Sequence, residues 1–299
     1  MIPSLLLFAF HTTALPQIGF VARFYSSPGS AKETTYQVYV ADIDGKNRHQ
    51  LTYLKGRMSD VRWLGGTKVA FIQNIDNLHQ LWSVDSNGKN LKLISKGPVV
   101  SVADNRPLQD VRGKPIYLFN GEAMQFNGTK WVTTEIPLNN IYPPDSGPWK
   151  LQTNDDARPF TIVTEPMKIL DGPPSTMECQ LGGKTFTTAC YGIPTKMVFT
   201  KNPIIGYLNF FQHNSTNGTS YTITRVDFST GKGVLQAQGF GDLDFSPGSA
   251  LYAGVTPRDL VPYGKKTVWG TTIQVGKPGL KATTIVKGLV ACQSVALQP

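Results

Sequence analysis

The segment VYVADIDGKN at Val38–Asn47 is repeated almost unchanged as LWSVDSNGKN at Leu81–Asn90. In each copy an apolar stretch leads into an Asp-Gly or Asn-Gly pair, and a second short stretch follows, RHQLT in the first and LKLIS in the second. Such pairs favour two-residue hairpin turns, because the primed turns require positive φ at both central residues. The repeat therefore predicts two copies of one β-hairpin, turning at Asp44-Gly45 and at Asn87-Gly88.

Similar hairpin signals recur along the rest of the chain. Their glycines fall at positions 45, 88, 128, 183, 231 and 276, with spacings of 43, 40, 55, 48 and 45 residues. An apolar stretch precedes each hairpin, at Ile18–Arg23, Lys68–Gln73, Pro115–Asn120, Pro159–Thr164, Gly206–Phe211 and Leu251–Val255. A fourth stretch comes before two of these, at Asp60–Gly66 and at Asp242–Ser249, with Trp63 and Phe245 in the same place. The chain therefore reads as six units of four short strands.

Six such units, with almost no helical periodicity, predict an all-β fold: a six-bladed β-propeller of four-stranded antiparallel blades. Packing such sheets face to face around an axis buries both apolar faces of each one. The chain starts with the second strand of a blade and ends with a strand that belongs to no unit, Gly288–Val295. We expect this strand to complete the first blade as its innermost strand and to close the ring.

The repeat resembles that of the TolB-type six-bladed propellers, a WD-repeat-like family. That family's repeat reads as an aromatic-bearing strand, an Asp-Gly turn, a strand ending in Leu-Thr, a Trp-containing strand, Pro-Asp-Gly-Lys and a strand such as IAF. Leu51-Thr52, Trp63 and Lys68–Phe71 follow this order, and Asp244–Gly248 matches it without the Asp of Pro-Asp-Gly. The resemblance is clear in the first, second and fifth units. It implies the fold rather than a function, because propellers serve as binding platforms and as enzymes.

The N-terminus has the features of a signal peptide. Ile2–Phe10 is almost wholly apolar, and the small residues of Thr12–Ala14 follow it, although no Lys or Arg occurs before Arg23. We therefore predict a signal peptide over residues 1–14, a propeller over residues 15–299, and export to the periplasm or the cell exterior. The alternative is that the apolar run forms an ordinary first strand. No other stretch approaches the length of a transmembrane helix.

The charge is strongly basic, with 29 Lys and Arg against 20 Asp and Glu and a formal net charge of +9. Ring closure would make the first and last blades neighbours and would bring two basic runs onto one side. This predicted basic binding face consists of Lys46, Arg48, Arg57, Arg62, Lys265, Lys266, Lys277 and Lys281. It would suit an acidic protein, an anionic lipid surface or an acidic polymer, whereas scattered solvated lysines are the alternative. Nucleic-acid-binding motifs are absent from the sequence.

The sequence carries few signs of catalysis. There is no G-x-S-x-G motif, and no residues remain for the separate hydrolase domain of propeller-bearing peptidases. Asp244 is the strongest candidate for a channel carboxylate, followed by Asp242 and Asp60, with Asp104 near an equivalent strand start. Their alternative role is to shape turns and blade corners. An enzyme would need two such acids, or an acid and a His, within hydrogen-bond reach in the channel.

Metal and cofactor sites are not predicted. The phrase ADIDGKN lacks the Asp and Glu that an EF-hand needs, because Val40 and Leu51 occupy those positions. We expect Asp42 and Asp44 to be turn residues instead. The sequence therefore favours a monomeric, non-catalytic propeller that binds a protein or an acidic ligand. The alternative is a propeller enzyme, a hydrolase or lyase acting on a sugar or lactone through channel carboxylates.

The three cysteines leave one question open. Cys179 and Cys190 are close enough in sequence for a disulfide in an exported protein. A tight turn at Gly182-Gly183 would place Cys179 opposite Phe186, so a disulfide would require a wider loop. We expect Cys292 to be a small buried apolar residue.

Overall fold

The computed structural model describes most of the N-terminal and C-terminal thirds of the chain and the strands between them. The described residues are 15–25, 32, 34–76, 78–95, 99–100, 108–109, 115–119, 122–134, 149–153, 160–164, 175–181, 184–190, 193–199, 205–214, 218–227, 230, 232–245, 251–263, 266–277 and 279–298. The predicted signal peptide, Asp104 and Lys265 lie outside them. Within the described part, no helix has the length and apolar character needed to cross a bilayer.

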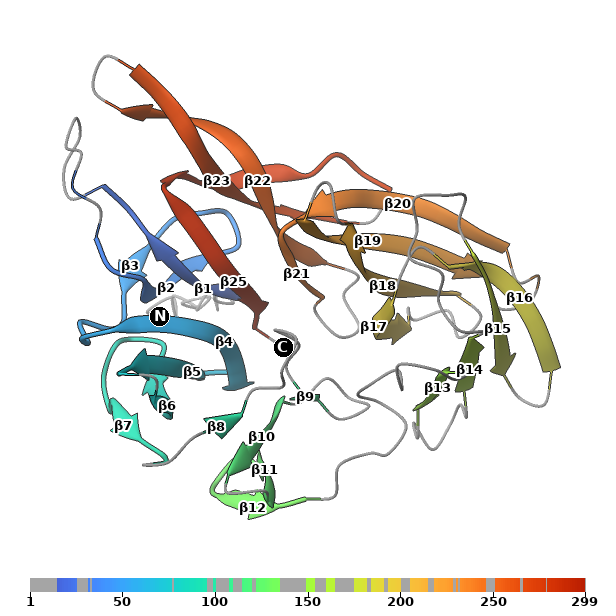
Figure 1. Ribbon diagram of the computed structural model, residues 1–299, viewed down its shortest axis with the longest axis horizontal. Helices are drawn as coiled ribbons and strands as arrows, with labels where there is room; N and C mark the ends of the chain where they lie inside the picture. Colours follow the sequence, from blue (N-terminus) through green and yellow to red (C-terminus); the bar gives the residue numbers. More distant parts are fainter. Residues whose placement is uncertain are drawn as a thin grey trace, which may run out of the picture.

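The described strands form six antiparallel sheets, five of them four-stranded, which lie around the C-terminal end of the chain (Figure 1). The first joins β1 (Gln17–Arg23), β2 (Gln37–Asp42) and β3 (His49–Gln50) to β25 (Ala291–Leu297). The second contains β4 (Arg57–Gly65), β5 (Lys68–Ile75), β6 (Leu78–Asp85) and β7 (Lys92–Leu93). The third contains β8 (Val99–Val100), β9 (Leu108–Gln109), β10 (Pro115–Phe119), β11 (Glu122–Phe126) and β12 (Trp131–Thr133).

The remaining sheets follow the same chain order. The fourth contains β13 (Trp149–Thr153), β14 (Phe160–Thr164), β15 (Ser175–Leu181) and β16 (Lys184–Cys190). The fifth contains β17 (Ile193–Phe199), β18 (Ile205–Asn214), β19 (Gly218–Asp227) and β20 (Lys232–Phe240). The sixth contains β21 (Asp242–Phe245), β22 (Tyr252–Tyr263), β23 (Lys266–Gly276) and β24 (Thr283–Leu289). The predicted all-β class and the four-stranded antiparallel sheets are therefore confirmed.

Strands β1 and β5 are apolar in their middle, over Ile18–Ala22 and Val69–Ile72, because both of their faces are covered there. In β1, Phe20 packs in a cluster with residues of β22, β23 and β25, whereas Val21 faces the second sheet. In β5, Phe71 faces the first sheet and Ile72 packs against Tyr117 of the third sheet. Consecutive side chains point to opposite faces of a strand, so the first and second sheets each pack between two neighbours.

The repeated hairpins turn differently from the prediction. Gly45 and Gly88 have φ of 83° and 81°, but Asp44 and Asn87 do not have positive φ. The Gly45 N–H donates to the carbonyl oxygen of Asp42 at 2.8 Å, and the Gly88 N–H makes the equivalent bond at 2.8 Å. The prediction of two-residue primed turns is therefore wrong. Each hairpin has a three-residue loop with glycine in the left-handed position, which L-residues adopt only with strain.

Side-chain hydrogen bonds explain the Gly-Lys-Asn phrase. Asn47 has a φ of 52°, and its Nδ2 donates to Asp42 Oδ2 at 2.6 Å. In the second copy Asn90 has a φ of 55°, and its Nδ2 donates to Asp85 Oδ2 at 2.6 Å. Asp44 Oδ1 accepts the Lys46 N–H at 3.0 Å. Asp42 and Asp44 are therefore turn residues, as predicted.

The C-terminal strand β25 belongs to the first sheet. It pairs antiparallel with β1, with Val295 opposite Phe20, and it also contacts the edge strands β4 and β21 of two other sheets. The strand runs from Ala291 to Leu297, whereas the predicted one began at Gly288. The difference arises because Gly288, with a φ of 77°, still belongs to β24.

The register of β15 and β16 bears on the cysteines. Cys179 lies opposite Phe186 and Cys190 lies opposite Ser175, as a tight turn would place them. The two cysteines are thus four residues apart along the ladder, a distance of about 13 Å at 3.3 Å per residue. A disulfide requires Cα atoms within about 7 Å, so this register does not allow the bridge.

Candidate functional site

A group of mostly buried polar side chains lies where the edge strands β4, β21 and β25 meet. We call it the buried polar cluster, and it consists of Asp60, Arg62, Tyr117, Asp242, Asp244 and Cys292. The side chains of Asp60 and Arg62 are only 13% and 15% exposed. Three of its members, Asp60, Asp242 and Asp244, are the acids that the sequence analysis proposed as channel carboxylates, whereas Arg62 as their charge partner was not foreseen.

A bulge in β4 brings Arg62 to Asp60. The register between β4 and β5 shifts between Ser59 and Arg62, and Asp60 has a φ of 51°. Such a bulge re-aims side chains that would otherwise alternate between the two faces. Nε and Nη2 of Arg62 both lie 3.1 Å from Asp60 Oδ1. Asp60 Oδ2 is buried and has no hydrogen-bond partner among the described residues.

Asp242 and Asp244 connect β21 to β25. Asp242 Oδ2 accepts the N–H of Val295 at 2.8 Å, and Asp244 Oδ2 accepts the N–H of Leu297 at 2.7 Å. Residues two apart on a strand point to the same face, which explains how both carboxylates reach the same neighbour. The two acids therefore accept hydrogen bonds from backbone N–H groups on the edge of β25 that does not pair with β1.

The electrostatics of the cluster depend on burial. Burial raises the pKa of Asp242 to about 6, even though Arg62 and two backbone N–H groups act in the opposite direction. Burial by itself would lower the pKa of Arg62, but the charges of Asp60, Asp242 and Asp244 raise it above its ordinary value. Arg62 therefore stays charged, and Asp242 is the carboxyl group that takes up a proton near pH 6.

Burial also shifts the pKa of two other members of the cluster. It raises the pKa of Tyr117 well above its ordinary value, and the Tyr117 hydroxyl has no hydrogen-bond partner among the described residues. Burial raises the pKa of the Cys292 thiol as well, so this side chain is a neutral thiol rather than a nucleophile. The described residues contain no group of three or more side chains arranged to hold a metal ion.

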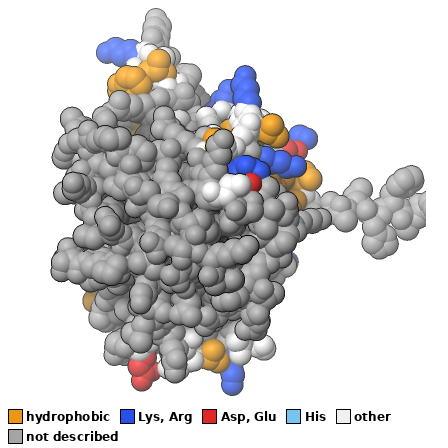
Figure 2. All heavy atoms as spheres, turned by 90° about the vertical axis from the view of Figure 1, so that its right-hand side faces the viewer, with side chains coloured by type: hydrophobic (Ala, Val, Ile, Leu, Met, Phe, Trp, Pro, Cys, Tyr) orange, Lys and Arg blue, Asp and Glu red, His pale blue; other side chains and the backbone are white. Residues whose placement is uncertain are grey.

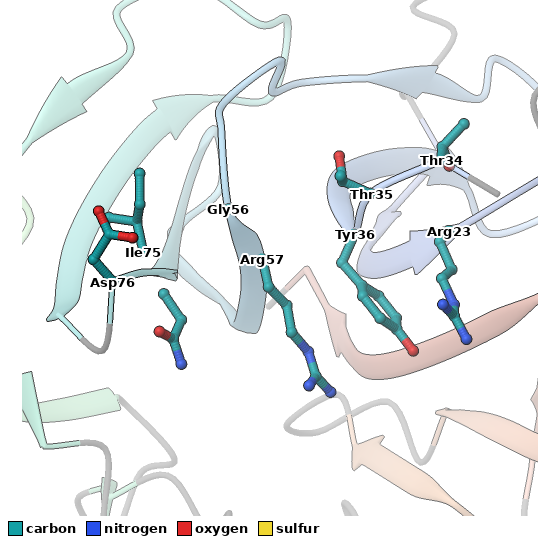
Figure 3. Close-up of a pocket in the computed structure, with 9 residues that line it drawn as sticks. Arg23, Thr34, Thr35, Tyr36, Gly56, Arg57, Ile75 and Asp76 are labelled. Atoms are coloured by element: carbon teal, nitrogen blue, oxygen red, sulfur yellow. The ribbon is translucent and has the colours of Figure 1, made fainter. Parts of the chain in front are cut away.

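A separate cavity of about 560 Å³ lies at the ends of strands in the first two sheets (Figure 3). Its walls come from the end of β1, the residues just before β2, the start of β4 and the end of β5, including Arg23, Tyr36 and Arg57. The guanidinium carbon of Arg23 lies 5.1 Å from the centre of the Tyr36 ring, and that of Arg57 lies 4.9 Å from it. We call this the arginine pocket.

The described residues of the predicted basic binding face have different surroundings. Lys46 is exposed and pairs with Asp44 at 2.9 Å, Arg48 lies over the Phe24 ring at 5.0 Å, Arg57 lines the arginine pocket, and Arg62 belongs to the buried polar cluster. Lys266 starts β23 and Lys277 directly follows its other end, and eleven residues of strand at 3.3 Å each span about 36 Å. Lys281 is exposed near Lys277. Figure 2 likewise separates the described Lys and Arg side chains on one face into groups at its upper and lower edges.

The sequence analysis did not identify several residues of the buried polar cluster and of the arginine pocket. Arg23 ends an apolar strand and Tyr36 directly precedes one, so each looked like an ordinary strand terminus. Tyr117 lies inside an apolar stretch and gave no sign of polar neighbours. Arg62 gave the one usable signal, because it stands between the buried residues Val61 and Trp63.

Comparison with solved structures shows which known fold this structure resembles. The model is similar to TolB from Acinetobacter baumannii, with a TM-score of 0.56 and 14% sequence identity over 95% of this chain and 67% of TolB. Lower scores relate it to the AtxE2 isopeptidase (TM-score 0.44, 9% identity, 93% of this chain and 54% of that one). A putative 6-phosphogluconolactonase from Bacteroides uniformis gives a TM-score of 0.39 and 12% identity, over 94% of this chain and 99% of that one.

The likeness to TolB establishes a β-propeller fold, and at this identity it says nothing of the activity. The chain spans about two thirds of the TolB chain and about half of the isopeptidase chain. No family model matches the sequence, and no curated protein is significantly similar to it.

Proposed function

We propose that this protein is a monomeric six-bladed propeller of the TolB kind that acts as a non-catalytic binding platform for a protein or acidic ligand. The six sheets support this number of blades, and the pairing of β25 with β1 supports a ring closed by the C-terminal strand. The proposal includes removal of residues 1–14, export, and a mature propeller over residues 15–299.

The observation that favours binding over catalysis is the way the acids of the buried polar cluster are used. Asp242 and Asp244 each accept a backbone N–H of β25, and Asp60 pairs with Arg62. A catalytic acid pair must present its carboxyl groups to a substrate. The carboxyl groups of Asp242 and Asp244 instead join β21 to β25, and that of Asp60 holds Arg62 within β4, which are structural roles.

An enzyme is the second candidate, and one observation favours it. Asp242 and Asp244 act on each other electrostatically, and burial raises the pKa of Asp242 to about 6, a value suited to general acid catalysis near neutral pH. The protein would then be a hydrolase or a lyase acting on a sugar or lactone. It would require a substrate to reach acids that are now bonded to β25.

The two candidates are separated by comparing the wild-type protein with Asp244→Asn. This variant removes the charge and keeps an oxygen that can accept the Leu297 N–H. A platform should capture the same partner from a native envelope fraction in both forms and should turn over no sugar or lactone. Turnover by the wild-type protein that disappears in the variant, without any captured partner, would establish the enzyme instead.

Export has its own test. The N-terminal residue of the mature protein, read by Edman degradation or mass spectrometry, should lie near Leu15. Intact Met1 in protein recovered from the cytoplasm would contradict the proposed signal peptide.

A further inference from the structure

The arginine pocket is an open depression of the surface with two positively charged side chains in its wall. Its volume of about 560 Å³ lies inside the range of about 300–1,000 Å³ that ligand sites typically have. Arg57 lies in β4, Arg23 ends β1, and Tyr36 directly precedes β2. The pocket is therefore formed by the packing of the first two sheets and not by a single loop.

Arg57 is held in place with most of its guanidinium group available. Its guanidinium carbon lies 4.9 Å from the centre of the Tyr36 ring, and its Nε donates to Gln293 Oε1 at 3.1 Å. No carboxylate of the described residues forms an ion pair with Arg57, and the residue is exposed. A guanidinium group fixed in this way loses little rotamer freedom when it binds a carboxylate.

Arg23 provides a second positive charge at a defined distance. Its guanidinium carbon lies 5.1 Å from the centre of the same Tyr36 ring, and Figure 3 shows the two arginines on either side of this tyrosine. The two guanidinium carbons are therefore no more than about 10 Å apart, because each lies about 5 Å from one ring centre. Two carboxylates on one ligand can each reach one of the arginines.

Thr35 and Asp76, two other residues of the pocket wall, influence where an acidic group can bind. The Thr35 hydroxyl accepts a hydrogen bond from Gln37 Nε2 at 3.0 Å, so its own proton is left to donate. Asp76 lies on the other side of Arg57 from Tyr36, as Figure 3 shows, and it is exposed. Its negative charge disfavours an acidic group at that end and directs such a group toward the arginines.

We propose that the arginine pocket binds an extended peptide segment with two acidic side chains in the pattern acid-x-acid. In an extended chain the residues i and i+2 point to the same side and lie about 6.6 Å apart, a spacing that two arginines within about 10 Å can both meet. The proposal rests on the platform function and names the chemistry of its partner. A single small anion would occupy little of the volume and would engage one arginine well.

The test measures the binding of a fluorescein-labelled peptide, Ser-Glu-Val-Glu-Ser, to the intact protein by fluorescence anisotropy. Two further peptides are compared with it: Ser-Gln-Val-Gln-Ser, which has no acids, and Ser-Glu-Glu-Val-Ser, whose adjacent acids point to opposite sides. We expect the first peptide to bind at least about tenfold more tightly than either, because only its two acids can both form charge-assisted hydrogen bonds with the two arginines.

The chain offers a matched control for the protein side of the test. Arg48 is also an exposed arginine above an aromatic ring, at 5.0 Å from the centre of Phe24, and it does not line the pocket. Arg57→Gln should weaken binding of the acid-x-acid peptide at least about tenfold, whereas Arg48→Gln should change it less than about twofold. Thermal unfolding of both variants shows whether each remains folded.

Three results would overturn the proposal: equal binding of the three peptides, equal effects of the two variants, or displacement of the peptide by inorganic phosphate at the same concentration as by unlabelled peptide. The last would show a site for a single anion. A different experiment, capture of a partner from the envelope fraction, tests the platform function. If wild-type protein and Arg57→Gln capture the same envelope partner equally well, the pocket proposal is wrong and the platform stands, whereas a wild-type protein that captures none refutes the platform.

Discussion

Trp63 shows how one residue connects sheets that are distant in sequence. It is 6% exposed, and its Nε1 donates to the carbonyl oxygen of Ala296 in β25 at 3.0 Å. The ring also lies close to Gly19, where an added Cβ would be 3.5 Å from Nε1. One tryptophan of the second sheet therefore holds both β25 and β1 of the first.

Replacing Trp63 by Phe should lower the free energy of unfolding by about 1–3 kcal/mol. The substitution leaves the buried Ala296 carbonyl without its donor, which carries a cost of that size. Urea denaturation followed by circular dichroism measures the change. Trp269→Phe is the control, because Trp269 is 68% exposed and its replacement should change stability by less than about 0.5 kcal/mol. Equal losses in the two variants would contradict a special role for Trp63.

Asp242 predicts a pH dependence with a definite sign. Burial raises its pKa to about 6, above the value of about 3.9 for an exposed aspartate. Between these values the folded state holds a proton that the unfolded state has released, so this contribution to stability is complete below about pH 4 and is lost as the pH rises through 6.

Asp242→Asn should remove this pH dependence, because the amide resembles the protonated acid. The variant should therefore gain stability relative to the wild-type protein as the pH rises from about 4 to about 7, with a slope of at most about 1.4 kcal/mol per pH unit. Urea denaturation across this range measures the difference. Asp44→Asn is the control, because the hydrogen bond and charge of Lys46 hold the pKa of Asp44 below its ordinary value and outside this range. A difference that shrinks with rising pH would contradict the burial of a proton on Asp242.

At the scale of the element, the two copies of the repeat form the same hairpin in different surroundings. A Cβ added at Gly45 would collide with the carbonyl oxygen of Ile285 in β24, whereas a Cβ at Gly88 would meet nothing within 4 Å. Both glycines have a φ near 80°. An alanine would therefore be strained by its positive φ at either position. Only at position 45 would it also clash with a neighbouring sheet.

Gly88→Ala should lower the free energy of unfolding by about 1–2 kcal/mol, the cost of a left-handed conformation for an L-residue. Gly45→Ala should lower it clearly more, because the Ile285 carbonyl is backbone and cannot move aside without shifting β24. Denaturation of the two variants in parallel gives the comparison. Equal losses would mean that the first hairpin does not pack against β24 as the structure shows.

The hairpins also show why sequence gave the strands more accurately than the turns. The predicted stretches at Ile18–Arg23 and Lys68–Gln73 coincide with β1 and β5 to within two residues, because strand identity depends on apolar runs that are local. The turn type was predicted wrongly because it is decided by side-chain bonds such as that of Asn47 to Asp42. Those bonds compete closely with other local conformations, and the Asp-Gly pair is compatible with more than one of them.

At the scale of the whole molecule, β25 is the strand on which several sheets depend. It pairs with β1, accepts the indole N–H of Trp63, and donates backbone N–H groups to Asp242 and Asp244. Val295 and Leu297 are almost completely buried. The nine C-terminal residues therefore join three sheets that are separated by most of the chain.

A chain that ends at Val290 should lose cooperative thermal unfolding, because β1 loses its partner strand and the acids of β21 lose theirs. Calorimetry and near-ultraviolet circular dichroism measure the loss. A synthetic peptide of residues 291–299 should restore the transition in a concentration-dependent manner. A truncated chain that melts as the full one does would show that β25 does not hold these sheets together.

The sequence by itself determined the all-β class, the position of nearly every strand that its repeat marks, and the membership of a C-terminal strand in the first sheet. These follow from apolar periodicity and turn chemistry, which act over a few residues. Tertiary structure alone decided that Arg62 lies among carboxylates and that Arg23 and Arg57 flank Tyr36 in one pocket. Those outcomes depend on a bulge, on strand direction and on the packing of sheets, none of which a local pattern of residues encodes.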